Sequence, residues 1–418
     1  MYGHVYTFHI WHDSNNVILY MQILSSDLEW KECADLPSRI SFAQATVIDD
    51  QVFVGGCDAD GVDIKALSTV YCYNLRSDEW STLGYLQATA GSFQHMLSVS
   101  SSGDDSICHE ASNRDAQLEP IVHFGLGKYP FVSEGAVKIR LVAVGGFQGG
   151  TAINDVHVYA GDGRFKKWEP YPSMKYCRCK CSVISHVERS TLIVAGGNSL
   201  ADQTGQLSSV ELFQSGIWYQ CMKLCFPCER FSSVLIDDKC YLLGGYKDWD
   251  GLIRAAMCTS IEEMMIAHES VDGDSSDEEN GVFNDAECDR ESSKISNIRS
   301  CVARSSSIPS PWQKLGMETP NYASSSAYLL KSIVAVGGKS KDGEAKSAVH
   351  FFSPAINQWV QIATLPFPLI SPTIAMLSAT EFLAIGGGGN GVDAKQGTKK
   401  VFKATLKFYA PQQKHLTL

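Results

Sequence analysis

Five cysteines gather around two arginines in the middle of the chain, and thiolates are common ligands of structural zinc. The two groups are Cys177, Cys179 and Cys181 around Arg178, and Cys225 and Cys228 before Arg230. In an extended segment, alternate residues lie on one face about 6–7 Å apart, which is long for thiolates that share one ion. We therefore expect no metal and no cofactor. Whether the two groups meet is left open by the sequence.

Catalytic patterns are sparse. The chain contains no Gly-x-Ser-x-Gly elbow, no P-loop and no His-Glu-x-x-His motif. The 11 histidines are not grouped with spaced cysteines or acidic residues. The prediction from these residues is a protein that is not an enzyme.

Composition narrows the class of protein further. With 418 residues, 44% of them apolar, and 35 glycines, the chain can bury a large core made of short strands and tight turns. It has no run of about 18 apolar residues and no basic residue ahead of its first apolar run. The remaining cysteines are scattered through apolar runs, as in a reducing compartment. These features predict a cytoplasmic protein without a membrane span.

The net charge of −11 is unevenly distributed. Residues 262–310 contain twelve acidic and four basic residues, which gives this segment −8 and leaves about −3 elsewhere. No basic stripe that would suit a phosphate backbone is present, so we expect no nucleic-acid partner.

An internal repeat organises the chain. Six apolar runs end in glycine pairs, and six tryptophans lie at related offsets from them. The pairs are Gly55-Gly56, Gly145-Gly146, Gly196-Gly197, Gly244-Gly245, Gly337-Gly338 and Gly386-Gly387, and the tryptophans are Trp30, Trp80, Trp168, Trp218, Trp312 and Trp359. A Val-x-apolar-aromatic run stands between most pairs and their tryptophan, as in Val210-Glu211-Leu212-Phe213. Each repeat therefore predicts four strands.

Such four-stranded sheets must stack on one another, because a single sheet of this size cannot bury both of its faces. The glycine pair is expected where backbones approach closely and φ is positive, and the aromatic residues where twisted sheets leave a wedge between them. Trp30 has no glycine pair before it and Gly386-Gly387 has no tryptophan after it, which predicts that the two chain ends share the last sheet.

These motifs resemble the kelch-repeat family of the galactose-oxidase-like superfamily, from about Val17 to Phe408. The resemblance implies an all-β, six-bladed β-propeller over residues 1–418, with seven blades as the alternative. Val401 to Phe408 is the candidate third strand of the last blade, and Val17 to Ile23 competes with it. The fold itself is compatible with many functions.

The blade topology predicts that the loops between strands 2 and 3 and the connections from strand 4 to the next blade share one face. We expect the partner there, because recognition residues usually lie on loops of a rigid scaffold. By resemblance to kelch proteins that receive acidic groups, Arg39, Arg178 and Arg230 would line the mouth, although pairing within the propeller is an equal alternative. The candidates on the 2–3 loops are Asp58, Asp60, Gln148, Trp249 and Lys339.

Two insertions interrupt the repeat. Residues 87–119 are expected in a 4–1 connection, with the following first strand at Ile121 to Lys128 rather than at Phe93 to Val99. Residues 262–310 are expected in a 3–4 loop, where Ser260 and Glu263 form a capping-box pattern that opens a short helix. The acidic, serine-rich remainder cannot offset its ordering entropy and is predicted to be disordered; Ser275 and Ser276 precede acidic residues as kinase substrates do.

The resulting prediction is a monomeric, non-catalytic module that binds a protein or peptide partner. Two narrower alternatives are a substrate-recognition subunit of a ubiquitin ligase and a cytoskeleton-binding protein. An alternative of another class is a kelch-type enzyme, an oxidase or a sugar isomerase. The sequence does not identify the partner.

Overall fold

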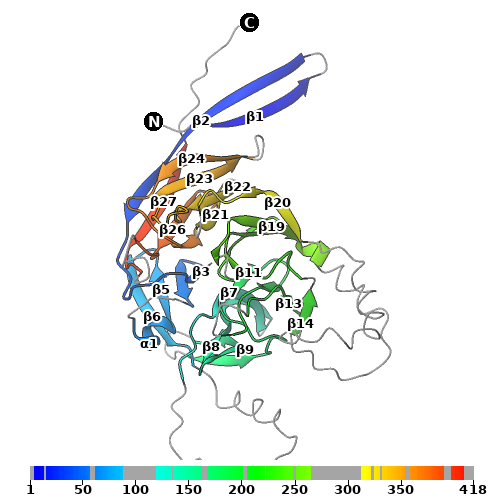
Figure 1. The fold of residues 1–418 in the computed structure, drawn as a ribbon, viewed down its shortest axis with the longest axis vertical. Coiled ribbons are helices and arrows are strands. Elements are labelled where there is room, and N and C mark those ends of the chain that lie inside the picture. Colours follow the sequence, from blue (N-terminus) through cyan, green and yellow to red (C-terminus); the bar gives the residue numbers. More distant parts are fainter. Residues whose placement is uncertain are drawn as a thin grey trace, which may run out of the picture.

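In the computed structural model, the described residues are 4–13, 16–56, 62–87, 119–133, 135–161, 167–200, 205–221, 223–247, 251–264, 312–321, 324–329, 332–353, 358–389 and 397–408. Antiparallel four-stranded sheets stand around an axis, each with its first strand innermost (Figure 1). The inner strands contact one another in the order β3, β7, β11, β15, β21, β25 and back to β3. The predicted six-bladed propeller is therefore confirmed.

Blades 1 to 3 follow the chain without interruption. Blade 1 consists of β3 (Gln44–Ile48), β4 (Gln51–Gly55), β5 (Thr69–Asn74) and β6 (Glu79–Tyr85), with helix α1 (Ile64–Leu67) in its 2–3 loop. Blade 2 consists of β7 (Gly125–Ser133), β8 (Ala136–Gln148), β9 (Thr151–Tyr159) and β10 (Trp168–Tyr171). Blade 3 consists of β11 (Ser182–His186), β12 (Thr191–Ala195), β13 (Val210–Gln214) and β14 (Ile217–Cys221).

Blades 4 and 5 repeat the plan. Blade 4 consists of β15 (Ser232–Ile236), β16 (Lys239–Leu243), β19 (Ala255–Ser260) and β20 (Gln313–Glu318), and the small pair β17 (Tyr246–Lys247) and β18 (Gly251–Leu252) lies in its 2–3 loop. Blade 5 consists of β21 (Ser325–Leu329), β22 (Ser332–Val336), β23 (Ala348–Ser353) and β24 (Gln358–Thr364).

Blade 6 joins the two ends of the chain. Its first three strands are β25 (Thr373–Met376), β26 (Glu381–Ile385) and β27 (Val401–Phe408), and its fourth is the second half of β2 (Asn16–Glu32). Trp30 pairs with Ala404 in this sheet, and Phe382 pairs with Ala404 from the other side. The third strand is thus Val401–Phe408, and the competing expectation for Val17 to Ile23 is wrong: that segment pairs with β1 (His4–Asp13).

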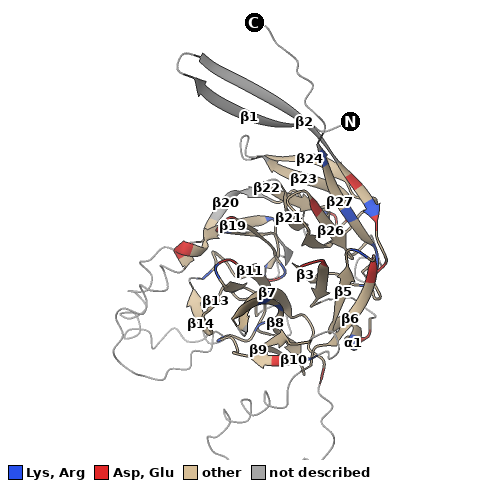
Figure 2. Cartoon of the chain, turned by 180° about the vertical axis from the view of Figure 1, so that it is seen from behind, with Lys and Arg blue, Asp and Glu red and all other residues tan. Residues whose placement is uncertain are grey.

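The β1–β2 hairpin extends beyond the ring past β24 (Figure 1). Next to it, basic and acidic residues alternate along the outer strands of blade 6 (Figure 2). Lys403 Nζ lies 2.9 Å from Glu381 Oε1, and Lys407 Nζ lies 2.5 Å from Glu29 Oε2. The Lys407–Glu29 pair thus joins the closing strands β2 and β27, and the Lys403–Glu381 pair joins β27 to β26.

Aromatic side chains fill the outer wedges, as the motif predicted. The third-strand aromatic contacts the fourth-strand tryptophan within a blade, with ring centroids 4.9 Å apart for Tyr73 and Trp80 and 5.0 Å apart for Phe213 and Trp218. In blade 6, Trp30 meets Phe382 edge-on at 5.8 Å. Each pair covers apolar surface that a twisted sheet would otherwise leave open.

The backbone of a glycine pair contacts the connection that leads into the next blade. Gly197 N donates to Cys228 O (2.9 Å), and Gly387 N donates to Ile40 O in the same way (2.9 Å). A Cβ atom on Gly196 would lie 2.4 Å from Cys228 O, and Gly196 has φ +54°. Only glycine satisfies both the positive φ and the close backbone approach.

Parts of both predicted insertions lie outside the described residues, namely 88–118 and 265–311. The first falls between β6 and β7, and the second between β19 and β20. The strand after the first insertion is Gly125–Ser133, which overlaps the favoured Ile121 to Lys128 and begins later. The predicted capping box is confirmed, because Glu263 N donates to Ser260 Oγ (3.1 Å) and Ser260 N to Glu263 Oε2 (3.0 Å), ahead of a helical turn at 261–264.

Candidate mouth of the central channel

One cavity lies on the axis of the propeller, at the end where the 4–1 connections enter the inner strands. Its volume is about 150 Å³, and its wall comes from the starts of all six inner strands. Isolated bridges join these connections to residues just after the glycine pairs, as between Glu229 and Tyr246 or between Cys179 and Asn198. The connections and the 2–3 loops therefore meet on the same face of the molecule.

Five of the six blades, all but blade 5, contribute a described residue in the left-handed conformation to the rim of this cavity. They are Phe42 (φ 50°), His123 (φ 55°), Lys180 (φ 53°), Arg230 (φ 53°) and Ser371 (φ 47°). Lys180 N donates to His123 O (2.8 Å), and Arg230 N donates to Lys180 O (3.0 Å). The sharp backbone turn is thus held by hydrogen bonds between neighbouring blades, and it aims the side chains at the mouth.

Two cations of the rim share one buried carboxylate. Glu229 Oε1 lies 3.6 Å from Arg230 Nε and 3.9 Å from Lys180 Nζ, and Asn198 Nδ2 donates to Glu229 Oε2 (2.7 Å). The Arg230 guanidinium also stacks over the Phe42 ring at 4.6 Å. This trio of Lys180, Arg230 and Glu229 places two cations beside one carboxylate at the rim.

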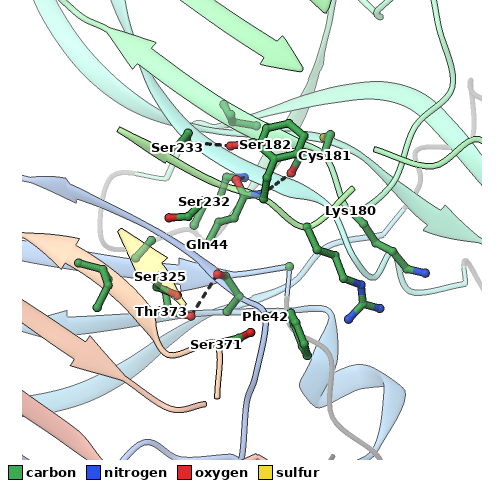
Figure 3. Close-up of a pocket in the computed structure, with 18 of the residues that line it drawn as sticks. Phe42, Gln44, Lys180, Cys181, Ser182, Ser232, Ser233, Ser325, Ser371 and Thr373 are labelled. Carbon is green, nitrogen blue, oxygen red and sulfur yellow. Dashed lines mark hydrogen bonds between the residues drawn. The ribbon is translucent and has the colours of Figure 1, made fainter. Parts of the chain in front are cut away.

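Hydroxyl and amide side chains line the cavity below the rim (Figure 3). Hydrogen bonds of these side chains, and of Ser185 outside the lining, connect every blade to the next. In order around the ring, the contacts are Leu126 N to Gln44 Oε1 (3.2 Å), Lys128 N to Ser185 Oγ (2.9 Å), Ser182 Oγ to Ser233 Oγ (2.8 Å), Ser326 N to Ser232 Oγ (2.8 Å), Ser325 Oγ to Pro372 O, and Thr373 Oγ1 to Ala43 O (3.1 Å). These bonds satisfy polar groups in a narrow space and fix the spacing of the inner strands.

The three predicted arginines do not lie together. Arg178 is fully buried, and its NH2 donates to Glu211 Oε1 (2.7 Å) while its NH1 donates to Gly196 O (2.8 Å). Arg178 therefore pairs within the propeller and does not line the mouth. Arg39 is exposed on the connection into blade 1 and is not part of the cavity wall. Arg230 alone lines the mouth.

The loop candidates are only partly described. Gln148 is half-buried, and its amide donates to Glu119 O. Lys339 is half-buried at a bridge to Ala345. Asp58, Asp60 and Trp249 lie outside the described residues.

Three of the five cysteines around Arg178 and Arg230 are core residues. Cys179, Cys181 and Cys228 are buried, whereas Cys177 and Cys225 are exposed. Burial raises the pKa of Cys179 and of Cys228 to about 12 and that of Cys181 to about 11. Within the described chain, no three His, Cys, Asp or Glu side chains lie close enough together to hold a metal ion.

Sequence reasoning missed Phe42 and Lys180, although a positional signal exists. A backbone carbonyl of the connection lies against the glycine pair of the preceding blade, as those of Ile40 and Cys228 do. The rim residue is found two positions after the residue that supplies this carbonyl. Counting from that residue in each repeat would have selected Lys180 and Arg230.

The Kelch motif matches residues 39–87, which is blade 1 together with the connection that enters it. The chain is a kelch-repeat β-propeller. Among 264 matching chains of solved structures is one described as "Structure of YjhT", with a TM-score of 0.56 and 11% identity over 90% of this chain and 99% of that one. At that identity the likeness establishes the fold of the kelch propeller alone.

Comparison with curated proteins gives no match. Within the described residues, the kelch propeller has no helix long and apolar enough to cross a bilayer.

Proposed function

We propose that this kelch propeller is a non-catalytic interaction module that binds an acidic group of a protein or peptide partner at the mouth of its channel. The observation that carries the proposal is the trio of Lys180, Arg230 and Glu229 above a ring of hydroxyl groups. Two cations beside one carboxylate can also donate to a carboxylate of a partner. Charge-assisted hydrogen bonds of this kind are roughly twice as strong as neutral ones.

The position of the trio supports the same role. The side chains of Lys180 and Arg230 keep 17% and 18% of their surface exposed, so a partner can reach them. The 2–3 loops stand on the same face and would contact the flanking residues of the partner. Free thiols throughout the described chain support a cytoplasmic setting, and we propose that the protein works there as a monomer.

The test is partner capture from cells by proximity labelling, with the wild-type protein compared with Lys180→Ala and Arg230→Ala. Loss of one charge-assisted hydrogen bond removes roughly 1.5–3 kcal/mol, so the specific partner should fall by about tenfold or more in each variant. Arg76→Ala is the matched control, because Arg76 is a highly exposed cation in a 3–4 turn on the other face. Identical partner sets in all variants would remove the mouth from the binding surface.

The two narrower roles, substrate recognition for a ubiquitin ligase and binding to the cytoskeleton, follow from the resemblance to kelch proteins. The identity of the partner that Arg230→Ala loses distinguishes between them.

A further inference from the structure

A second surface lies on the opposite face, where the strands of blade 2 extend beyond those of the other blades. β7 and β8 pair continuously from Gly125↔Val144 to Ser133↔Ala136, whereas β11 and β12 form five pairs. β9 pairs with β8 only as far as Val142, so the part of β8 nearer the β7–β8 turn is not paired with β9. In the described chain, therefore, β7 is the only strand that pairs with Ala136–Arg140, and the outer backbone edge of this segment carries no strand.

One side of this projecting hairpin is firmly anchored. Tyr129 packs against blade 3, with its ring 5.2 Å from that of Phe213, and the Phe131 ring lies 5.2 Å from that of Tyr171 on β10 of blade 2 itself. The Arg140 guanidinium lies over the Phe131 ring at 5.5 Å. Edge-to-face aromatic packing of this kind holds the hairpin in one orientation.

The other side is apolar and exposed. Val132 and Val137 face each other across the two strands with 79% and 66% of their surfaces exposed, and Ile139 is 38% exposed. Single exposed aliphatic residues are ordinary. Three neighbouring β-branched residues beside an open strand edge are different, because such an edge is a ready template for another strand.

We propose that the edge of β8 from Ala136 to Arg140 receives an extended segment of a partner protein in which aliphatic and acidic residues alternate. Successive side chains of β8 point to opposite faces, so Val137 and Ile139 are on one face and Lys138 and Arg140 on the other. An added strand places its own side chains beside these on each face. Aliphatic residues then meet Val137 and Ile139, and carboxylates meet Lys138 and Arg140.

A second copy of the chain fits this edge poorly. Pairing β8 with β8 brings Lys138 and Arg140 of the two copies together, and like charges in neighbouring strands are destabilising. The sign of the charge thus selects an acidic partner. This surface is separate from the mouth, so the kelch propeller would hold two different segments on its two faces.

The probe is a fluorescent eight-residue peptide of alternating Glu and Val, titrated with the full-length protein and followed by fluorescence anisotropy. A Lys–Val alternating peptide tests charge, and an acidic peptide N-methylated at alternate residues removes the backbone donors. The protein variants are Val137→Ser and Lys138→Glu, whose exposed positions leave folding intact, as a thermal melt checks. Ile64→Ser, an aliphatic residue 52% exposed in α1 on the mouth face, is the matched control.

Saturable binding of the acidic peptide is expected, with at least tenfold loss in both β8 variants and with the N-methylated peptide. Ile64→Ser and Arg230→Ala should bind as the wild type does. No saturable binding, equal binding of the N-methylated peptide, or a loss confined to Arg230→Ala would overturn the proposal; that last result would instead support the function proposed for the mouth. Self-association of the wild type that Val137→Ser abolishes would also overturn it, in favour of a second copy.

Discussion

Arg178 and Glu211 connect the segment between blades 2 and 3 to the core of blade 3. Both side chains are fully buried, and the backbone nitrogens of Lys175 and Tyr176 also donate to the Glu211 carboxylate. Arg178→Ala leaves this carboxylate buried without its counter-ion, which costs about 3–5 kcal/mol. Arg189→Ala, which removes an exposed pair with Asp238, should change the unfolding free energy by less than about 1 kcal/mol. Guanidinium denaturation measures both, and equal losses would contradict the argument.

The reactivity of each cysteine thiol is also decided at the residue scale, by how deeply the side chain is buried. Burial raises the pKa of Cys179, Cys228 and Cys240 to about 12, from an ordinary value of 9.0. Since the thiolate is the nucleophile, iodoacetamide at pH 8 should modify exposed Cys225 and spare these three until the protein is unfolded. Between about pH 9 and pH 12 the unfolded chain binds fewer protons than the folded one, so stability should fall as pH rises. Peptide mass spectrometry reads the labelling; early modification of Cys228 would show that the core opens there.

At the scale of elements, the contact between a glycine pair and the next blade can be tested by substituting Gly386, with Gly84 as the control. Gly386 and Gly84 both have positive φ, +61° and +91°. A Cβ on Gly386 would lie 2.7 Å from Ile40 O, where blade 6 meets blade 1, whereas nothing lies within 4 Å of one on Gly84. Gly84→Ala should therefore cost only the backbone strain, roughly 1–2 kcal/mol, and Gly386→Ala clearly more. Thermal melts of the two variants test this, and equal shifts would mean that the close approach contributes nothing.

The elements were the part of the structure most accessible from sequence. Glycine pairs, third-strand aromatics and tryptophans recur in the same order and at related offsets because each is needed once per blade, so they predicted six blades and the shared last blade. Side-chain direction was less accessible. Arg39 lies one residue before Ile40, whose carbonyl docks on the preceding glycine pair. Arg178 itself supplies the equivalent carbonyl in the next repeat but one, and Arg230 lies two residues after Cys228, which supplies it in the repeat after that. A shift of one residue in an extended segment reverses the direction of the side chain, which separates Arg39 from Arg178, and the left-handed backbone of Arg230 directs its side chain to the mouth.

At the scale of the whole molecule, the ring is closed by residues that are almost the whole chain apart. Seven residue pairs, from Ser26↔Phe408 to Glu32↔Phe402, join β2 to β27, and Cys33 N donates to Val401 O (3.0 Å) just beyond them. In the described part of the same hairpin, residues 4–13 pair with residues 16–25 and not with blade 6. Two truncations therefore separate the projecting hairpin from the strand that closes the ring.

Deletion of residues 1–24 should leave the melting temperature within a few degrees of the wild type, because the fourth strand of blade 6 is retained. Deletion of residues 1–33 also removes Trp30 and uncovers Phe382 and the edge of β27. Since all six blades depend on that closure, the loss should appear as a lower, broader unfolding transition of the entire propeller and not as local fraying. Differential scanning calorimetry distinguishes the two cases. A longer truncation that melts as cooperatively as the shorter one would mean that the inner ring of hydroxyl contacts, running from Thr373 back to Ala43, holds the circle without its outer strand.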